Sequence, residues 1–224
     1  MQPEGKISVS VMCSDLMNLE RDFRELERLG VDYLHVDVTD AHFVPNLTFG
    51  VDFIRAMHGV TALPLDIHMM VEEPGPLLDA MDLRSGDLVS LHVEQGERLH
   101  GLARALRARG VRFGVVLNPE VPVASLEPYL DEIEWVTLML VHPGFAGAKL
   151  IDGILDKVAE ARRYLDAKGY PDVEISVDGS VSCERAAYMR RLGASIFVGG
   201  TAGIYRKGMT LARSVPQFRQ AISD

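Results

Sequence analysis

Short apolar segments alternate with longer amphipathic segments along the whole chain. The apolar segments are nearly continuous in hydrophobicity, as in the run from Trp135 to Val141, which is typical of strands buried on both faces of a parallel sheet. This pattern predicts eight strands, at Ile7–Met12, Tyr33–Val38, Leu65–Met70, Leu88–Val93, Arg112–Leu117, Trp135–Val141, Val173–Val177 and Ile196–Gly199.

The segments between these strands have the periodicity of amphipathic helices. Asp15 is the expected N-cap of the first helix and Gly30 its expected end, with apolar residues at helical spacing between them at Leu16, Leu19, Phe23 and Leu26. Similar patterns precede Gly110 and Gly169. Eight strand–helix units in 224 residues predict a single domain, residues 1–224, folded as a (β/α)8 TIM barrel. A doubly wound open sheet is the alternative, but it would rarely need eight strands in so short a chain.

Polar residues at the C-terminal ends of barrel strands are candidates for catalysis, because the active sites of these barrels lie there. His35 and Asp37 are two residues apart on the second strand and therefore project to the same face. Asp66 and His68 form a similar pair on the third strand. The polar strand-end residues, expected to converge on one mouth, are Ser10, His35, Asp37, His68, His92, Asn118, His142 and Asp178.

A single histidine at a strand end is more often a hydrogen-bonded residue of the rim than a metal ligand. Four such histidines with two aspartates at the same mouth favour a metal site. Imidazoles and carboxylates together suit Zn, Mn, Fe or Co better than a site made of oxygen atoms alone would. His58 and His100 fall in helical segments, and we expect both at the surface.

Glycine-rich loops follow the last three strands, at 142–147, 178–180 and 199–203. Barrels of this type commonly bind phosphate at such loops, because glycine lets backbone N–H groups approach the anion closely. The alternative is that glycine only makes tight turns here, which would account for any one of these loops. The loops contain no lysine or arginine, so a phosphate there would be held by amide dipoles.

Charge and composition exclude several classes of partner. The formal charge of -9 argues against nucleic acid or an anionic membrane. No apolar run approaches the roughly 20 residues of a membrane-spanning helix. Cys13 and Cys183 are too few and too far apart for a disulfide framework or a cysteine-based zinc site, and we expect them to be reduced thiols of a cytoplasmic protein.

Six ordered motifs resemble those of the ribulose-phosphate 3-epimerase family over nearly the whole chain. They lie at 10–15, 35–46, 66–71, 117–119, 143–147 and 177–179. Two other families of phosphate-binding barrels, orotidine-phosphate decarboxylase and hexulose-phosphate synthase, carry an Asp-x-Lys-x-x-Asp motif. The equivalent region of this chain has no lysine, which argues against both.

The resemblance implies a role for each matching residue. His35, Asp37, His68 and Asp178 match the ligands of one divalent metal ion, and Asp37 and Asp178 also match the two acid/base carboxylates. Ser10 and His68 match contacts with the substrate, a ketose phosphate. The substrate loops, including the phosphate cradle, would contribute Gly144, Phe145, Ala146, Gly147, Gly179, Ser180, Gly200 and Thr201. The resemblance to this family also implies a homo-oligomer.

The chemistry of a 3-epimerase fits these roles. Inversion of a carbon next to a ketone requires removal of its proton on one face and return of a proton on the other, hence two opposed acid/base groups. The intermediate is a cis-enediolate, whose developing charge a divalent metal stabilises. Two carboxylates at such a site should titrate as a coupled pair.

Five positions depart from the usual family pattern. Thr39 replaces a methionine, Ala148 replaces a glutamine, and Ala41, Ala146 and Ser180 each replace a glycine. These variants resemble the allulose-6-phosphate 3-epimerase branch. The expected substrate pair is therefore D-allulose 6-phosphate and D-fructose 6-phosphate, with D-ribulose 5-phosphate and D-xylulose 5-phosphate second. A catalytically silent sugar-phosphate-binding barrel is the alternative from another class.

Overall fold

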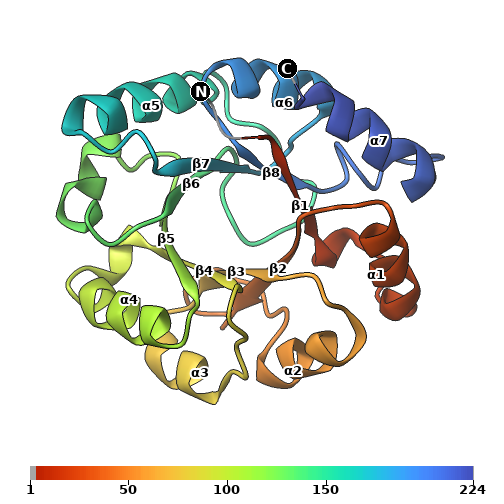
Figure 1. Ribbon diagram of the computed structural model, residues 1–224, viewed down its shortest axis with the longest axis horizontal. Coiled ribbons are helices and arrows are strands. Elements are labelled where there is room, and N and C mark those ends of the chain that lie inside the picture. The colour runs from red at the N-terminus through yellow and green to blue at the C-terminus, as the bar shows by residue number, and fades with distance from the viewer. Residues whose placement is uncertain (1–3, 224) are drawn as a thin grey trace.

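Eight parallel strands close into a barrel in the computed structural model, which describes residues 4–223 (Figure 1). Each strand pairs with the strands before and after it in the chain, and β8 pairs with β1. The strands are β1 Lys6–Ser10, β2 Tyr33–Thr39, β3 Leu65–Met70, β4 Leu88–His92, β5 Arg112–Leu117, β6 Trp135–Met139, β7 Glu174–Asp178 and β8 Ile196–Gly199. The predicted (β/α)8 fold is confirmed.

Helices surround the barrel and separate its strands from solvent (Figure 1). They are α1 Leu19–Arg28, α2 Val51–Val60, α3 Pro74–Ala80, α4 Arg98–Ala108, α5 Asp156–Lys168, α6 Cys183–Arg191 and α7 Leu211–Ala221. Three 3₁₀ helices complete the set: η1 Val11–Cys13, η2 Val93–Gln95 and η3 Val123–Tyr129, the last of which connects β5 to β6.

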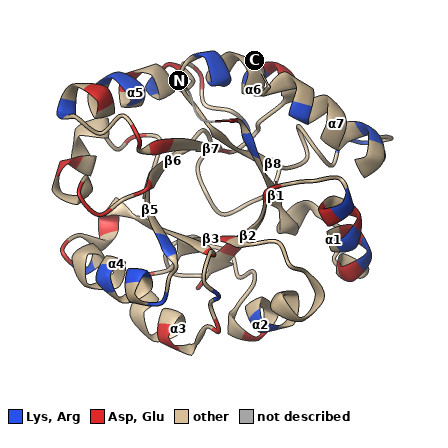
Figure 2. Cartoon of the chain, viewed as in Figure 1, with Lys and Arg blue, Asp and Glu red and all other residues tan. Residues whose placement is uncertain are grey.

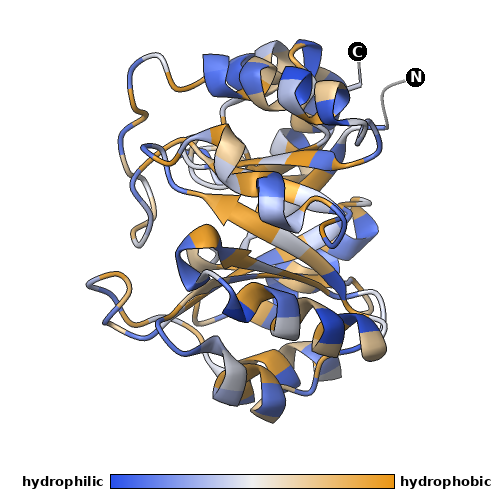
Figure 3. Cartoon of the chain, turned by 90° about the vertical axis from the view of Figure 1, so that its left-hand side faces the viewer, coloured by the Kyte–Doolittle hydropathy of each residue, from blue (hydrophilic) through white to orange (hydrophobic). Residues whose placement is uncertain are grey.

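The distribution of polarity follows this layered arrangement. The strands are largely hydrophobic, whereas the outward faces of the helices are hydrophilic (Figure 3). Lys, Arg, Asp and Glu lie mainly on the outer helices and connecting loops (Figure 2). None of the helices within residues 4–223 is long and apolar enough to cross a membrane.

The register of the strands brings polar residues to one level of the barrel. Asp37 of β2 pairs with His68 of β3, and His35 pairs with Asp66 two residues before them. Ser10 of β1 pairs with His35 from the other side. Residues that are distant in sequence are therefore neighbours around one end of the barrel.

The first connection differs from the prediction. β1 ends at Ser10 rather than Met12, and α1 begins at Leu19 with Asn18 as its N-cap, so Asp15 lies outside the helix. The carboxylate of Asp15 instead accepts hydrogen bonds from Met17 N and from the side chains of Asn18 and Arg21. This local turn delays the helix, and Leu16 is 53% exposed rather than packed on its apolar face.

The expected surface position of His58 was wrong, whereas His100 keeps 29% of its side chain exposed. His58 is buried on the inner face of α2, where its Nε2 lies 3.0 Å from Asp87 Oδ2. It occupies the same face as Ile54 and Met57, so the helix has a paired polar residue within its apolar stripe. His100 is half-buried, and its Nδ1 lies 2.7 Å from Glu132 Oε2.

Candidate active site

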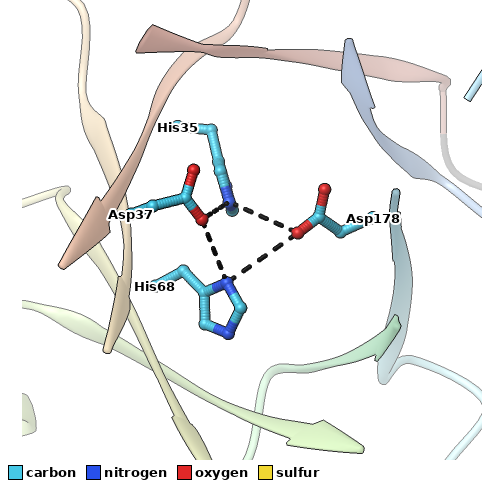
Figure 4. Close-up of side chains that lie close together, drawn as sticks. All are labelled: His35, Asp37, His68 and Asp178. Carbon is cyan, nitrogen blue, oxygen red and sulfur yellow. Dashed lines mark ion pairs between the residues drawn. The ribbon is translucent and has the colours of Figure 1, made fainter. Parts of the chain in front are cut away.

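Four side chains from three strands converge at the C-terminal end of the barrel (Figure 4). His35 and Asp37 come from β2, His68 from β3 and Asp178 from β7, and their four possible ligand atoms all lie within 4.8 Å of one another. Asp37 Oδ1 is 3.4 Å from both His35 Nε2 and His68 Nδ1. Asp178 Oδ2 is 3.7 Å from His35 Nε2 and 3.8 Å from His68 Nδ1.

The donor set of this quartet fits a divalent cation. His35 Nε2 and His68 Nδ1 are buried and have no hydrogen-bond partner within residues 4–223. Buried nitrogen atoms without a partner are costly, and a cation between them and the two carboxylates would satisfy both. Two imidazoles and two carboxylates are a recognised ligand set for zinc and related transition metals.

A buried carboxylate orients His35 from behind. His35 Nδ1 lies 2.8 Å from Asp66 Oδ2, and Ser8 Oγ donates to the same oxygen at 2.7 Å. Burial alone would raise the pKa of Asp66, but the charge of His35 and the hydrogen bonds from His35 and Ser8 lower it. Such a partner fixes the ring so that its Nε2 faces the centre.

His68 has a histidine partner instead. The Nε2 atoms of His68 and His92 lie 2.8 Å apart, and both rings are fully buried. The ring of Phe43 covers His92 with a centroid distance of 4.6 Å. Burial, together with the charge of His68, lowers the pKa of His92 well below its usual value. His92 is therefore a neutral residue that contacts His68 from the side opposite to the quartet.

The two aspartates have opposite electrostatic environments. Burial alone would raise the pKa of Asp37, but the charges of His35 and His68, whose nearest nitrogen atoms both lie 3.4 Å away, lower it. Burial raises the pKa of Asp178, and the nearby negative charge of Asp37 adds to this effect. The pair is therefore divided into one carboxylate that ionises readily and one that retains a proton more easily.

A cavity of about 190 Å³ opens beside the quartet. Ser10, Asp37 and Asp178 are among its lining residues, and the loops after β6, β7 and β8 contribute most of the others. These loops contribute all the substrate-binding residues expected in them: Gly144, Phe145, Ala146, Gly147, Gly179, Ser180, Gly200 and Thr201. No Lys or Arg is among the described residues that line it. His68, expected to contact substrate, is buried behind this wall.

Three loop residues at the mouth of the barrel have positive backbone φ angles that bear on which side chain fits there. Gly179 has a φ of 105°, and a Cβ atom there would lie 2.6 Å from Val141 Cγ2, so the turn requires glycine. Ala41 and Ser180 are the non-glycine residues with positive φ within the described chain, at 61° and 53°. Both are among the five departures from the family pattern, and both replace a glycine.

The loop after β2 is tied to the rest of the mouth. Asp40 accepts hydrogen bonds from the backbone N–H groups of His42, Phe43 and Glu72. Asn46 Nδ2 donates to Gly144 O at 2.7 Å, which joins this loop to the loop after β6.

Two of the strand-end residues do not join the site. His142 is turned outward with 77% of its side chain exposed, and its Nδ1 is 4.0 Å from Glu120 Oε2. Asn118 is held by Glu94 at 2.7 Å. The sequence did not predict that Asp66 and His92 contact the two imidazoles of the quartet, because these contacts depend on how side chains meet across neighbouring strands. The available signal was the position of Asp66 two residues before His68 in one motif.

Comparison with known proteins assigns the chain to a family. A family model described as the ribulose-phosphate 3 epimerase family matches residues 6–204. The ribulose-phosphate 3-epimerase of Bacillus subtilis (strain 168) is 40% identical over 197 residues, which are 88% of this chain and 91% of that protein. The chain belongs to the ribulose-phosphate 3-epimerase family. The ribulose-phosphate 3-epimerase of Escherichia coli (strain K12) is 32% identical over 198 residues, 88% of this chain and 87% of that protein.

Membership of the ribulose-phosphate 3-epimerase family makes the chain an epimerase, an enzyme of the isomerase class. The expected hexulose phosphate specificity has no support among these relatives, whose names favour the pentulose alternative. A solved 3-hexulose-6-phosphate synthase from Salmonella typhimurium aligns with a TM-score of 0.68 over 97% of this chain and 98% of its own. At 17% identity, this likeness concerns the fold alone.

Proposed function

We propose that this epimerase interconverts D-ribulose 5-phosphate and D-xylulose 5-phosphate, with Asp37 and Asp178 as its proton carriers. The observation that supports the proposal is the placement of these two carboxylates on different sides of one centre (Figure 4). They come from β2 and β7, and both line the cavity. A substrate between them would present opposite faces of C3 to the two groups, as an inversion requires.

The pKa difference between the carboxylates supports a division of labour. Asp37, whose pKa is lowered, would remove the C3 proton in one direction, while Asp178, whose pKa is raised, would hold the proton to be returned. In the reverse direction the two residues exchange roles.

His35, Asp37, His68 and Asp178 would hold the divalent metal that the family implies. When bound, the metal stabilises the negative charge that develops on the ketone oxygen. Asp66 and His92 would keep the two imidazoles oriented toward it. Ser10, which lines the cavity, would contact the sugar.

The glycine-rich loops that line the cavity would bind the phosphate. Gly147, Gly179, Ser180, Gly200 and Thr201 come from three consecutive loops that meet there. Their backbone N–H groups are the donors available to an anion, since no basic side chain lines the described cavity wall. The phosphate would fix the sugar so that C3 lies between the aspartates.

Kinetics with two substrates test the proposal. We expect kcat/KM for D-ribulose 5-phosphate to exceed that for D-allulose 6-phosphate, and solvent deuterium to enter C3 during turnover. A higher value for the hexulose phosphate would reject the proposed substrate but not the mechanism. Absence of C3 exchange with both substrates in metal-loaded protein would reject the mechanism as well.

A further inference from the structure

The turn after β7 contains a conformation that needs an explanation. Ser180 has a φ of 53°, in the left-handed region where side chains are disfavoured and glycine is the usual residue. It lines the cavity next to Gly179. A residue other than glycine keeps such a conformation when contacts around it compensate for the strain.

Arg185, near the start of α6, provides these contacts. One of its terminal nitrogen atoms, Nη1, donates to Ser180 O at 2.7 Å and to Ser180 Oγ at 2.8 Å. The guanidinium therefore restrains the backbone and the side chain of Ser180 at the same time. Arg185 is half-buried and does not itself line the cavity, so it acts on the cavity wall through Ser180.

These contacts make the turn more favourable for an anion. The carbonyl oxygen and the hydroxyl lone pairs of Ser180 would repel a phosphate, and the guanidinium engages both oxygen atoms. A guanidinium only donates, so the hydroxyl hydrogen of Ser180 is not used in this contact and can be donated elsewhere. A cation on the oxygen polarises the hydroxyl and strengthens it as a donor.

We propose that Arg185 is a positioning residue for the phosphate group of the substrate and that it acts through Ser180. The inference rests on the proposed binding of phosphate in this cavity. It predicts that the effect of Arg185 on phosphate binding depends on the residue at position 180, because glycine would adopt the turn without the hydrogen bonds from Arg185.

A double-mutant cycle tests this dependence. We expect Arg185→Gln to raise the KM for D-ribulose 5-phosphate and the Kd for inorganic phosphate, measured by calorimetry, by roughly tenfold, the effect of about one charge-assisted hydrogen bond. Because the proton carriers are untouched, kcat should stay within about twofold. Added to Ser180→Gly, the same substitution should change either constant by less than about twofold.

Two further variants separate positioning from charge. Arg191→Gln, at the end of the same helix, removes the same charge away from Ser180 and should change neither constant. Arg185→Lys keeps the charge but lacks the planar donor group, so it should recover only part of the loss. Equal effects of Arg185→Gln in both backgrounds, or full recovery with lysine, would overturn the proposal.

The outcomes also distinguish this inference from the proposed function. If the unmodified protein epimerises neither ketose phosphate, the proposed function fails, while inorganic phosphate binding still reports on Arg185. Absence of phosphate binding to the unmodified protein would overturn the inference itself. If Arg185→Gln does not fold, the double variant with Ser180→Gly should fold, as judged by thermal unfolding. Failure of both variants to fold would also contradict the proposed role of Arg185.

Discussion

His92 Nε2 lies 2.8 Å from His68 Nε2, so that one buried imidazole is held by another. Only one hydrogen can occupy this contact. If His68 uses Nδ1 as a metal ligand, its hydrogen is on Nε2 and His92 must accept it. The neutral state of His92, which follows from its lowered pKa, is compatible with this arrangement.

We therefore predict that His92→Leu weakens metal binding by about 10–100-fold, the usual cost of losing a partner behind a metal ligand. His92→Gln, which offers an acceptor oxygen, should lose less. Competition with a chromophoric chelator measures both. His58→Leu serves as a control, because it removes a buried histidine paired with Asp87 outside the quartet and should lower stability without changing metal affinity. Unchanged affinity in His92→Leu would contradict the assigned role.

Asp37→Asn and Asp178→Asn should each abolish epimerisation. The loss should exceed the roughly 10²–10⁴-fold typical of general acid–base catalysis, because each substitution also weakens a metal ligand. Glu120→Gln, an exposed carboxylate near His142, is the control and should be nearly normal. With saturating metal, each aspartate variant should still exchange the C3 proton of one epimer slowly. Normal epimerisation by either variant would exclude a two-carboxylate mechanism.

The stability of the metal-free protein should depend on pH through His35. Burial alone would lower the pKa of His35, but the charges of Asp66 and Asp37 raise it well above its usual value. A raised pKa gives stabilisation that is complete below the unfolded value of about 6.5 and is lost as the pH rises through the folded value. The lowered pKa of Asp66 gives stabilisation that is present above about pH 3.9 and lost in acid.

Urea unfolding of chelator-treated protein should therefore show this contribution in full between about pH 4 and 6.5 and a decline above it. Asp66→Asn should reduce the dependence. Metal affinity should follow the opposite trend and increase with pH, because the ligand nitrogen of His35 must be unprotonated. A free energy of unfolding that rises between about pH 6.5 and 8.5 in the metal-free protein would contradict the prediction.

Gly179→Ala should disable the cavity, whereas Gly147→Ala should be mild. Both glycines have positive φ, so alanine is strained at either position. At Gly179 the new Cβ would also lie 2.6 Å from Val141, a residue of the cavity wall, whereas nothing lies within 4 Å at Gly147. We expect the first variant to raise the Kd for inorganic phosphate by at least about tenfold more than the second. Equal effects of the two substitutions would show that backbone strain, rather than the contact with Val141, weakens phosphate binding.

The sequence predicted the barrel for a clear physical reason, whereas the choice of the quartet from eight polar strand-end residues came from the resemblance to family motifs. Buried parallel strands are uniformly apolar, so their positions were evident, and the i, i+2 rule placed His35 and Asp37 on one face. The helix face of His58 was misjudged because a histidine in an amphipathic segment does not reveal its buried partner, here Asp87.

The contacts of Asp66, His92 and Arg185 could not be predicted in the same way. Each depends on the direction of a side chain after the strands and turns have met, rather than on spacing along one element. The positive φ of Ser180 was likewise not encoded in any local pattern, since glycine would have been the expected residue at such a turn.

The bond from Asn46 Nδ2 to Gly144 O has a consequence for engineering. It connects the loop after β2 to the loop after β6, 98 residues away in sequence, and the second of these loops lines the cavity. Grafting the loop after β6 from a relative would bring a backbone that has not been matched to Asn46. Chimeras that aim to alter substrate range should therefore exchange both loops together, and single-loop exchanges should give poorly ordered rims.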